Sequence, residues 1–165
     1  MQTGWLDHVM SAVSLLANWG LIWIAAAAGL LCTRSYRKTG AELFLALVFC
    51  LVVFSGLKAL FPRERPFVDY PHAALLISPP RSSSFPSGHA MSSFTCASVL
   101  FSSNRKAGTA AFVLAALIAF SRLYLFVHYP SDVLAGILLG LAAAKFIVYL
   151  FDKFFRPTLL GKHFS

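Results

Sequence analysis

Long apolar runs constrain this chain more than any other feature of its sequence. The clearest covers residues 41–60, and others cover residues 19–32, 107–127 and 131–151. Hydrophobic residues make up 58% of the chain and charged residues only 12%, with a mean hydropathy of +0.73. A soluble domain of 165 residues has too little interior to bury so much apolar surface. The bilayer is therefore expected to be the solvent for much of the chain.

The spacing of these runs predicts an all-α, integral-membrane helical bundle with about five transmembrane helices. We expect spans over residues 19–32, 41–60, 88–101, 107–127 and 131–151. Before them, residues 5–16 alternate at helical spacing, which predicts an N-terminal amphipathic helix that runs into the short first span. No Lys or Arg precedes Arg34, which argues against a cleaved signal peptide. With no repeat visible, residues 1–165 are expected to form a single membrane-embedded domain.

Glycines in the last span point to a helix contact. Gly136 and Gly140 lie four residues apart, which predicts a small-residue face for close helix packing. Simple tolerance of glycine in membrane helices would give the same pattern, so both interpretations stay open.

The positive charges predict an orientation in the membrane. Although the net charge is +8, the cations lie in turns between apolar runs, which favours anionic lipid as the partner and argues against nucleic acid. When the membrane crossings of the predicted spans are counted, eight cations fall on the same membrane face: Arg34, Arg37, Lys38, Arg105, Lys106, Lys153, Arg156 and Lys162. The positive-inside rule makes that face cytoplasmic. The N-terminus and the long loop over residues 62–86, which holds six of the eight prolines, are then expected outside.

Three polar clusters reach that outer face. They are Lys58 with Arg65-Pro66, then Pro86-Ser87-Gly88-His89, then Ser121-Arg122 with His128 and Asp132. Each alone has an ordinary interpretation, such as a snorkelling lysine, a helix start or a hydrogen-bonded pair one turn apart. Their convergence at one membrane level is what those interpretations leave unexplained.

Phosphoryl transfer explains the convergence. The group in transfer spreads negative charge over three oxygens, so positioning and electrostatic stabilisation dominate catalysis. The cations Lys58, Arg65 and Arg122 are predicted to bind those oxygens. Ser87 and Gly88, at a helix start, are predicted to add backbone N–H groups.

The two histidines and the aspartate complete the predicted chemistry. We expect His128 to attack phosphorus, Asp132 to orient its ring, and His89 to protonate the leaving oxygen and then activate water. The same three residues are also a two-His-one-carboxylate metal set. Three neighbouring cations would repel a dication, so no metal and no cofactor are expected.

These residues carry a resemblance to a known family. The three motifs, Lys58-x6-Arg65-Pro66, Pro86-Ser87-Gly88-His89 and Ser121-Arg122-x5-His128-x3-Asp132, resemble the signature of the type 2 phosphatidic-acid phosphatase superfamily at every position. The resemblance implies a metal-independent phosphohistidine mechanism and an all-helical core whose site faces the membrane surface. Vanadium-dependent haloperoxidases share the signature but are larger and soluble, so the hydropathy favours the lipid-phosphatase branch.

The short chain resembles bacterial members, which implies a multi-pass protein of the bacterial inner membrane. With a site on the extracytoplasmic face, the resemblance implies hydrolysis of undecaprenyl diphosphate to undecaprenyl phosphate. Phosphatidylglycerophosphate and phosphatidate are the alternative substrates. From another class, a non-enzymatic protein that binds or moves anionic lipid would need the cations but not the complete His128, His89 and Asp132 set. Oligomeric state is left open.

Overall fold

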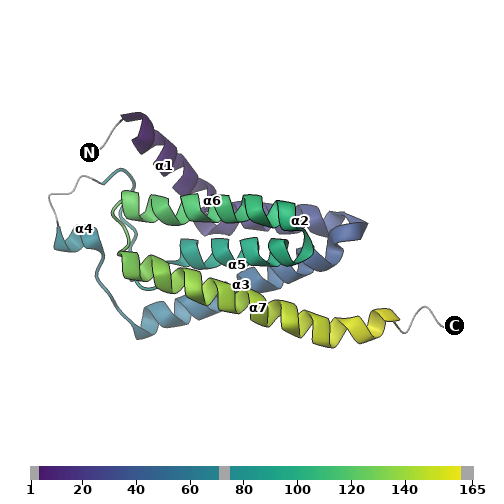
Figure 1. The fold of residues 1–165 in the computed structure, drawn as a ribbon. Helices are drawn as coiled ribbons and strands as arrows, with labels where there is room; N and C mark the ends of the chain where they lie inside the picture. The colour runs from purple at the N-terminus through teal and green to yellow at the C-terminus, as the bar shows by residue number, and fades with distance from the viewer. Residues whose placement is uncertain (1–3, 71–74, 161–165) are drawn as a thin grey trace.

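The computed structural model describes residues 4–70 and 75–160, and throughout these residues its regular structure is helical (Figure 1). The longer helices are α1 (Gly4–Leu16), α2 (Leu21–Cys32), α3 (Arg37–Leu60), α5 (Gly88–Ser103), α6 (Arg105–Tyr124) and α7 (Pro130–Leu160). Short 3-10 turns η1 (Asn18–Gly20) and η2 (Arg34–Tyr36) and the one-turn helix α4 (Pro66–Asp69) connect them. The predicted all-α fold is confirmed. Lys162, assigned to the basic face, lies outside the described residues.

Within the described residues, three stretches are long and apolar enough to cross a membrane: Arg34–Leu60, Arg105–Tyr124 and Pro130–Phe154. The pair Gly4–Leu16 and Asn18–Cys32, bent by 47°, makes a fourth if it crosses as one span. Helix α5 has only 16 residues, eight of them buried, against the roughly 20 that a bilayer crossing requires. The membrane bundle is confirmed, and the count of five spans stays a prediction.

Helix α5 lies at the centre of the bundle, between α6 and α7 and against α3 (Figure 1). Its Ser, Thr and Ala side chains leave room for close neighbours, and the single Thr95 hydroxyl lies within hydrogen-bond distance of the backbone oxygens of Met91 (2.8 Å) and Gly140 (3.0 Å). A Cβ added at Gly136 would lie 2.6 Å from the Ser87 oxygen, and one at Gly140 would lie 2.5 Å from the Met91 oxygen. The predicted small-residue face is therefore the contact between α7 and α5.

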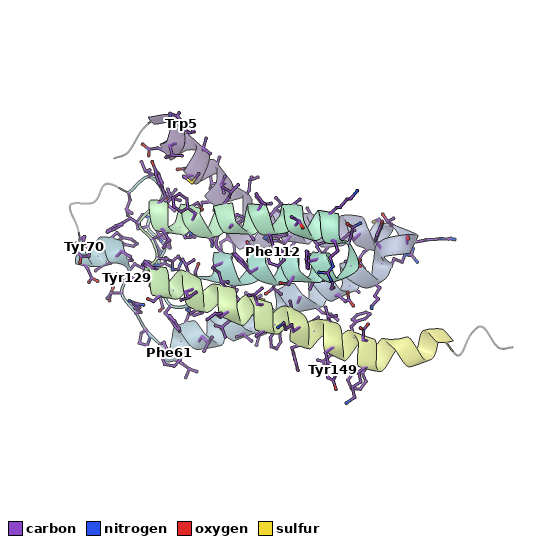
Figure 2. The ribbon with its side chains drawn as sticks, in the orientation of Figure 1. Trp5, Phe61, Tyr70, Phe112, Tyr129 and Tyr149 are labelled. Atoms are coloured by element: carbon purple, nitrogen blue, oxygen red, sulfur yellow. The ribbon has the colours of Figure 1, made fainter. Side chains whose placement is uncertain are left out.

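The topology gathers the polar motifs at one end of the bundle. The last turns of α3 and α6 and the first turns of α5 and α7 all lie there, on the side of α4 (Figure 1). Tyr129 lies at this end and Tyr149 farther along α7 toward the other (Figure 2). At that other end Lys38 pairs with Asp152 at 2.6 Å. The predicted separation of a motif-bearing end from a basic end matches the helix arrangement.

Candidate active site

Backbone oxygens of the long loop fix two of the predicted cations. The ammonium of Lys58, in the last turn of α3, donates to the Ser83 oxygen. The Arg65 guanidinium, only 5% exposed, donates from Nη2 to the same oxygen (3.3 Å), from Nε to the Ser82 oxygen (2.8 Å) and from Nη1 to the Val127 oxygen (2.8 Å). Lys58 and Arg65 therefore share one carbonyl and form one positively charged wall.

His128 lies between this wall and a carboxylate. Its side chain, in the turn between α6 and α7, is 4% exposed. Nε2 lies 3.4 Å from Nη1 of Arg65, while Nδ1 lies 3.6 Å from Oδ2 of Asp132 and 3.5 Å from the Ser84 hydroxyl. The ring therefore turns Nδ1 toward the carboxylate and Nε2 toward the cations.

Asp132 has closer partners than His128. The Ser84 hydroxyl (2.6 Å) and the Tyr129 backbone N–H (2.9 Å) donate to Oδ2, and Arg63 Nη1 donates to Oδ1 at 2.7 Å. The Arg63 guanidinium also stacks 4.2 Å from the centre of the Tyr129 ring. Since the Asp132 side chain is fully buried, these donors are what keep it stable as an anion.

Charge and burial set the protonation of His128. Burial lowers the pKa of His128 to about 4; the hydrogen bond with Asp132 opposes this, and the charges of Arg65, Arg122 and Lys58 lower the pKa further. Burial likewise lowers the pKa of Arg65 to about 10, which leaves it charged at neutral pH. A neutral imidazole beside fixed cations is the protonation state that a nucleophile needs.

The first turn of α5 adds the second motif. Ser87 is the N-cap, its hydroxyl accepting from the Ala90 N–H at 3.4 Å, and its own N–H donates to the Asp132 backbone oxygen at 3.0 Å. That N–H is thus paired within the protein, which leaves Gly88 as the first helix-terminal donor. The atoms nearest to a Cβ at Gly88 would be those of the Phe54 ring, at 3.5 Å or more, which is ordinary contact, so packing alone does not demand glycine there.

His89 and Arg122 take their partners from the N-terminal segment. His89 Nε2 lies 3.1 Å from the Asn18 amide oxygen, and Arg122 Nη1 donates to the Ser14 hydroxyl. Arg122 is 3% exposed, and its Nε is buried with no hydrogen-bond partner among the described residues. A buried, unpaired guanidinium N–H is suited to an anion.

The structure thus links the predicted site residues in two groups. Direct contacts join Arg65, His128, Asp132 and Ser87, and Lys58 is linked to Arg65 through the Ser83 oxygen that both bind. His89 and Arg122 are instead held by α1 and the break after it. A cavity of ≈ 510 Å³ opens beside Lys58 and Arg65 and is also lined by Arg63, Arg81, Ser82 and Ser83. Within residues 4–70 and 75–160, no group of three His, Cys, Asp or Glu side chains could hold a metal ion.

Four polar partners escaped prediction from sequence: Arg63, Ser84, Ser14 and Asn18. Arg63 stands two residues before Arg65, where the sequence fits a head-group or lid contact and a solvated loop charge equally and does not point to Asp132. Ser84 contacts a carboxylate 48 residues away, and no sequence spacing predicts such a loop contact. Asn18 reads only as an interruption at the end of the predicted amphipathic helix.

A sequence model of the PAP2 superfamily matches residues 39–156, which include every predicted motif. The chain belongs to this superfamily. An undecaprenyl-diphosphatase of Sulfolobus acidocaldarius is 36% identical over 72% of this chain and 58% of the relative. Phosphatidylglycerophosphatase B of Bacillus subtilis is 33% identical over 90% of this chain and 76% of the relative.

The crystal structure of a transmembrane PAP2 type phosphatidylglycerolphosphate phosphatase from Bacillus subtilis superposes with a TM-score of 0.74 at 27% identity, covering 94% of this chain and 81% of that one. The crystal structure of Aquifex aeolicus LpxE superposes with a TM-score of 0.81 at 28% identity, covering 90% of this chain and 88% of that one. The chain spans 58%, 61% and 53% of the length of the first three curated relatives that it matches. The N-terminal residues Ser14 and Asn18 lie before the stretch that the superfamily model matches.

Proposed function

We propose that this chain is a membrane lipid phosphatase that works through a phosphohistidine at His128, with no metal ion. One observation carries the proposal: the buried His128 ring directs Nδ1 toward Asp132 and Nε2 toward Arg65. A nucleophile needs one nitrogen oriented by a carboxylate and the other facing the phosphate-binding cations. An ordinary structural histidine needs no such arrangement.

In the first step, the Nε2 lone pair of His128 attacks phosphorus and the bond from phosphorus to the lipid oxygen breaks. The departing oxygen takes a proton from His89. Negative charge on the three equatorial oxygens is stabilised by Lys58, Arg65 and the unpaired Nε of Arg122. The products of this step are the dephosphorylated lipid and phosphohistidine.

In the second step, a water molecule attacks the phosphohistidine. His89, now neutral, accepts the water proton as the oxygen–phosphorus bond forms and the nitrogen–phosphorus bond breaks. Inorganic phosphate leaves, His128 returns to its neutral state, and His89 is protonated again for the next cycle. Asp132 stabilises the positive charge on the His128 ring in both steps, while Arg63 and Ser84 keep Asp132 ionised and in place.

We infer undecaprenyl diphosphate as the substrate, with undecaprenyl phosphate as the product. Two relatives named as undecaprenyl-diphosphatases are 36% and 38% identical to this chain over more than half of its length. Phosphatidylglycerophosphate is the second candidate, because the phosphatidylglycerophosphatase B match extends over 166 aligned residues. A panel that includes both lipids separates the two.

We also propose one domain over residues 1–165, located in a bacterial inner membrane with the site on the extracytoplasmic side. The support is the charge distribution, since Arg34, Arg37 and Arg105 lie at helix ends opposite the site. The exposed Arg81 offers a test, as Arg81→Cys in a Cys32→Ser background. A membrane-impermeant thiol reagent should label it from outside the cell, and labelling only after lysis would reverse the orientation.

The proposed activity is tested with the purified full chain in detergent containing EDTA, assayed for phosphate release from the lipid panel. Release is expected with at least one lipid, and His128→Ala should lower it by about 10³-fold or more. His8→Ala, at an exposed histidine on α1, is the matched control and should be unaffected. Lipid binding with no release from any substrate would favour the non-enzymatic alternative.

A further inference from the structure

The break between α1 and α2 delivers a polar side chain to His89. Helix α1 ends at Leu16, and the chain turns by 47° before α2 begins at Leu21. Asn18 lies in this turn, and its amide oxygen is 3.1 Å from Nε2 of His89, 71 residues away in the chain. Asn18 is thus a hydrogen-bond partner of the His89 ring.

The backbone of this turn is held in an unfavourable conformation. Trp19 has φ = 56° and Gly20 has φ = 69°, both in the left-handed region. Glycine adopts it freely, but for a tryptophan it costs roughly 1–2 kcal/mol. The Trp19 side chain is 90% exposed, so its own packing within the protein does not require this conformation. Strain of this kind, next to a candidate catalytic histidine, points to a functional constraint.

Contacts on both sides of the break fix the position of Asn18. Before it, the Ser14 hydroxyl accepts from Arg122, and Asp7 accepts from the Tyr124 hydroxyl at 2.6 Å. After it, the Trp23 indole N–H donates to the Ser93 hydroxyl at 3.0 Å. The turn is thus anchored to α6 on one side and to α5, which carries His89, on the other.

We infer that Asn18 is a positioning residue for His89. Its amide oxygen accepts the Nε2–H, which leaves Nδ1 as the nitrogen that gives the proton to the leaving oxygen and later takes one from water. An acceptor on Nε2–H also stabilises the protonated ring that the first step needs. This inference rests on the proposed phosphatase mechanism, and it assigns a role to residues outside the 39–156 stretch matched by the superfamily.

The test measures how the full-length chain hydrolyses two substrates whose leaving groups differ in their need for a proton. A dialkanoyl phosphatidate releases an alcohol oxygen that needs a proton, whereas p-nitrophenyl phosphate releases a stable phenolate that does not. Asn18→Ala should lower kcat/KM for the phosphatidate by about 10- to 100-fold and for p-nitrophenyl phosphate by less than about 3-fold. Asn18→Asp, which keeps an acceptor oxygen at the same reach, should recover most of the loss.

Asn104→Ala is the matched control, because Asn104 caps α6 at the opposite end, accepting from the Ala107 N–H at 3.0 Å. It should affect both substrates equally if it affects either. Equal losses on both substrates with Asn18→Ala, or no loss, would overturn the role of Asn18. A wild-type chain that releases phosphate from neither of these substrates nor from undecaprenyl diphosphate or phosphatidylglycerophosphate would instead refute the phosphatase proposal itself.

Discussion

Substituting Gly136 by alanine tests whether the contact between α7 and α5 sets the geometry of the site. The new Cβ would lie 2.6 Å from the Ser87 oxygen and 3.2 Å from the Met91 nitrogen, whereas ordinary contact begins at 3.4 Å. Both neighbours are backbone atoms, so no side-chain rotation relieves the overlap. The first turn of α5 must therefore move by about 0.8 Å, the difference between 3.4 and 2.6 Å.

This displacement should cost more activity than stability. Overpacking of this size destabilises by roughly 1–3 kcal/mol, and the better helix propensity of alanine offsets up to about 1 kcal/mol of it. The moved turn carries Ser87, whose N–H binds the Asp132 oxygen at 3.0 Å, and also Gly88 and His89. A misplacement near 1 Å costs about 10²-fold in rate, so kcat/KM should fall 10- to 100-fold.

The assay is kcat/KM on the best lipid substrate, together with thermal unfolding in the same detergent. Gly29→Ala is the matched control, because a Cβ at Gly29, in helix α2, meets nothing within 4 Å. Its activity should stay at the wild-type level, and its stability should stay the same or rise by up to about 1 kcal/mol through helix propensity. Activity of Gly136→Ala within about twofold of wild type would refute the claim that this contact sets the site geometry.

Three further predictions concern the site itself. Since burial lowers the pKa of His128 to about 4, the unfolded chain binds a proton that the folded one does not between pH 6.5 and 4. The free energy of unfolding should therefore decrease by up to about 3 kcal/mol as the pH is lowered from 6.5 to 4. The decrease should be smaller in His128→Gln, which thermal unfolding measured at several pH values would show. Arg65→Lys should lower kcat/KM by about 10²-fold, because one ammonium cannot replace three nitrogens bonded to two loop carbonyls and Val127; near-normal turnover would contradict this. Ser84→Ala should lower kcat about tenfold with KM nearly unchanged, since Asp132 loses its 2.6 Å donor; a pure KM effect would count against it.

The sequence predicted that the motifs meet at one end of the bundle, because the apolar runs mark which segments cross the bilayer and their order decides which helix ends share a membrane face. Once residues 41–60, 107–127 and 131–151 are taken as helices through a bilayer, Lys58, His128 and Asp132 must lie near one end. The one-turn spacing of His128 and Asp132 then predicts their proximity, and in the structure Nδ1 of His128 lies 3.6 Å from Oδ2 of Asp132. These are short-range or topological consequences, which periodicity captures.

The hydrogen bonds around Asp132 and His89 could not be predicted in this way. The loop over residues 62–86 has no periodicity, and its path depends on tertiary contacts such as the Ser84 N–H to the Arg63 oxygen at 2.9 Å. Asn18 reaches His89 only because the backbone leaves helical geometry at Trp19. Nor does the sequence show that the Thr95 hydroxyl of α5 lies within hydrogen-bond distance of the Met91 and Gly140 backbone oxygens.

Trapping the phosphoenzyme tests the central claim most directly. The variant His89→Gln should still form phosphohistidine from p-nitrophenyl phosphate, which needs no acid, but should hydrolyse it slowly because it lacks the base. Rapid quenching at alkaline pH followed by peptide mass spectrometry is then expected to find phosphate on His128, and none when His128→Ala is added. Phosphate release by the wild-type chain with no labelled His128 in the trapped variant, or with the label on another residue, would contradict the proposed mechanism.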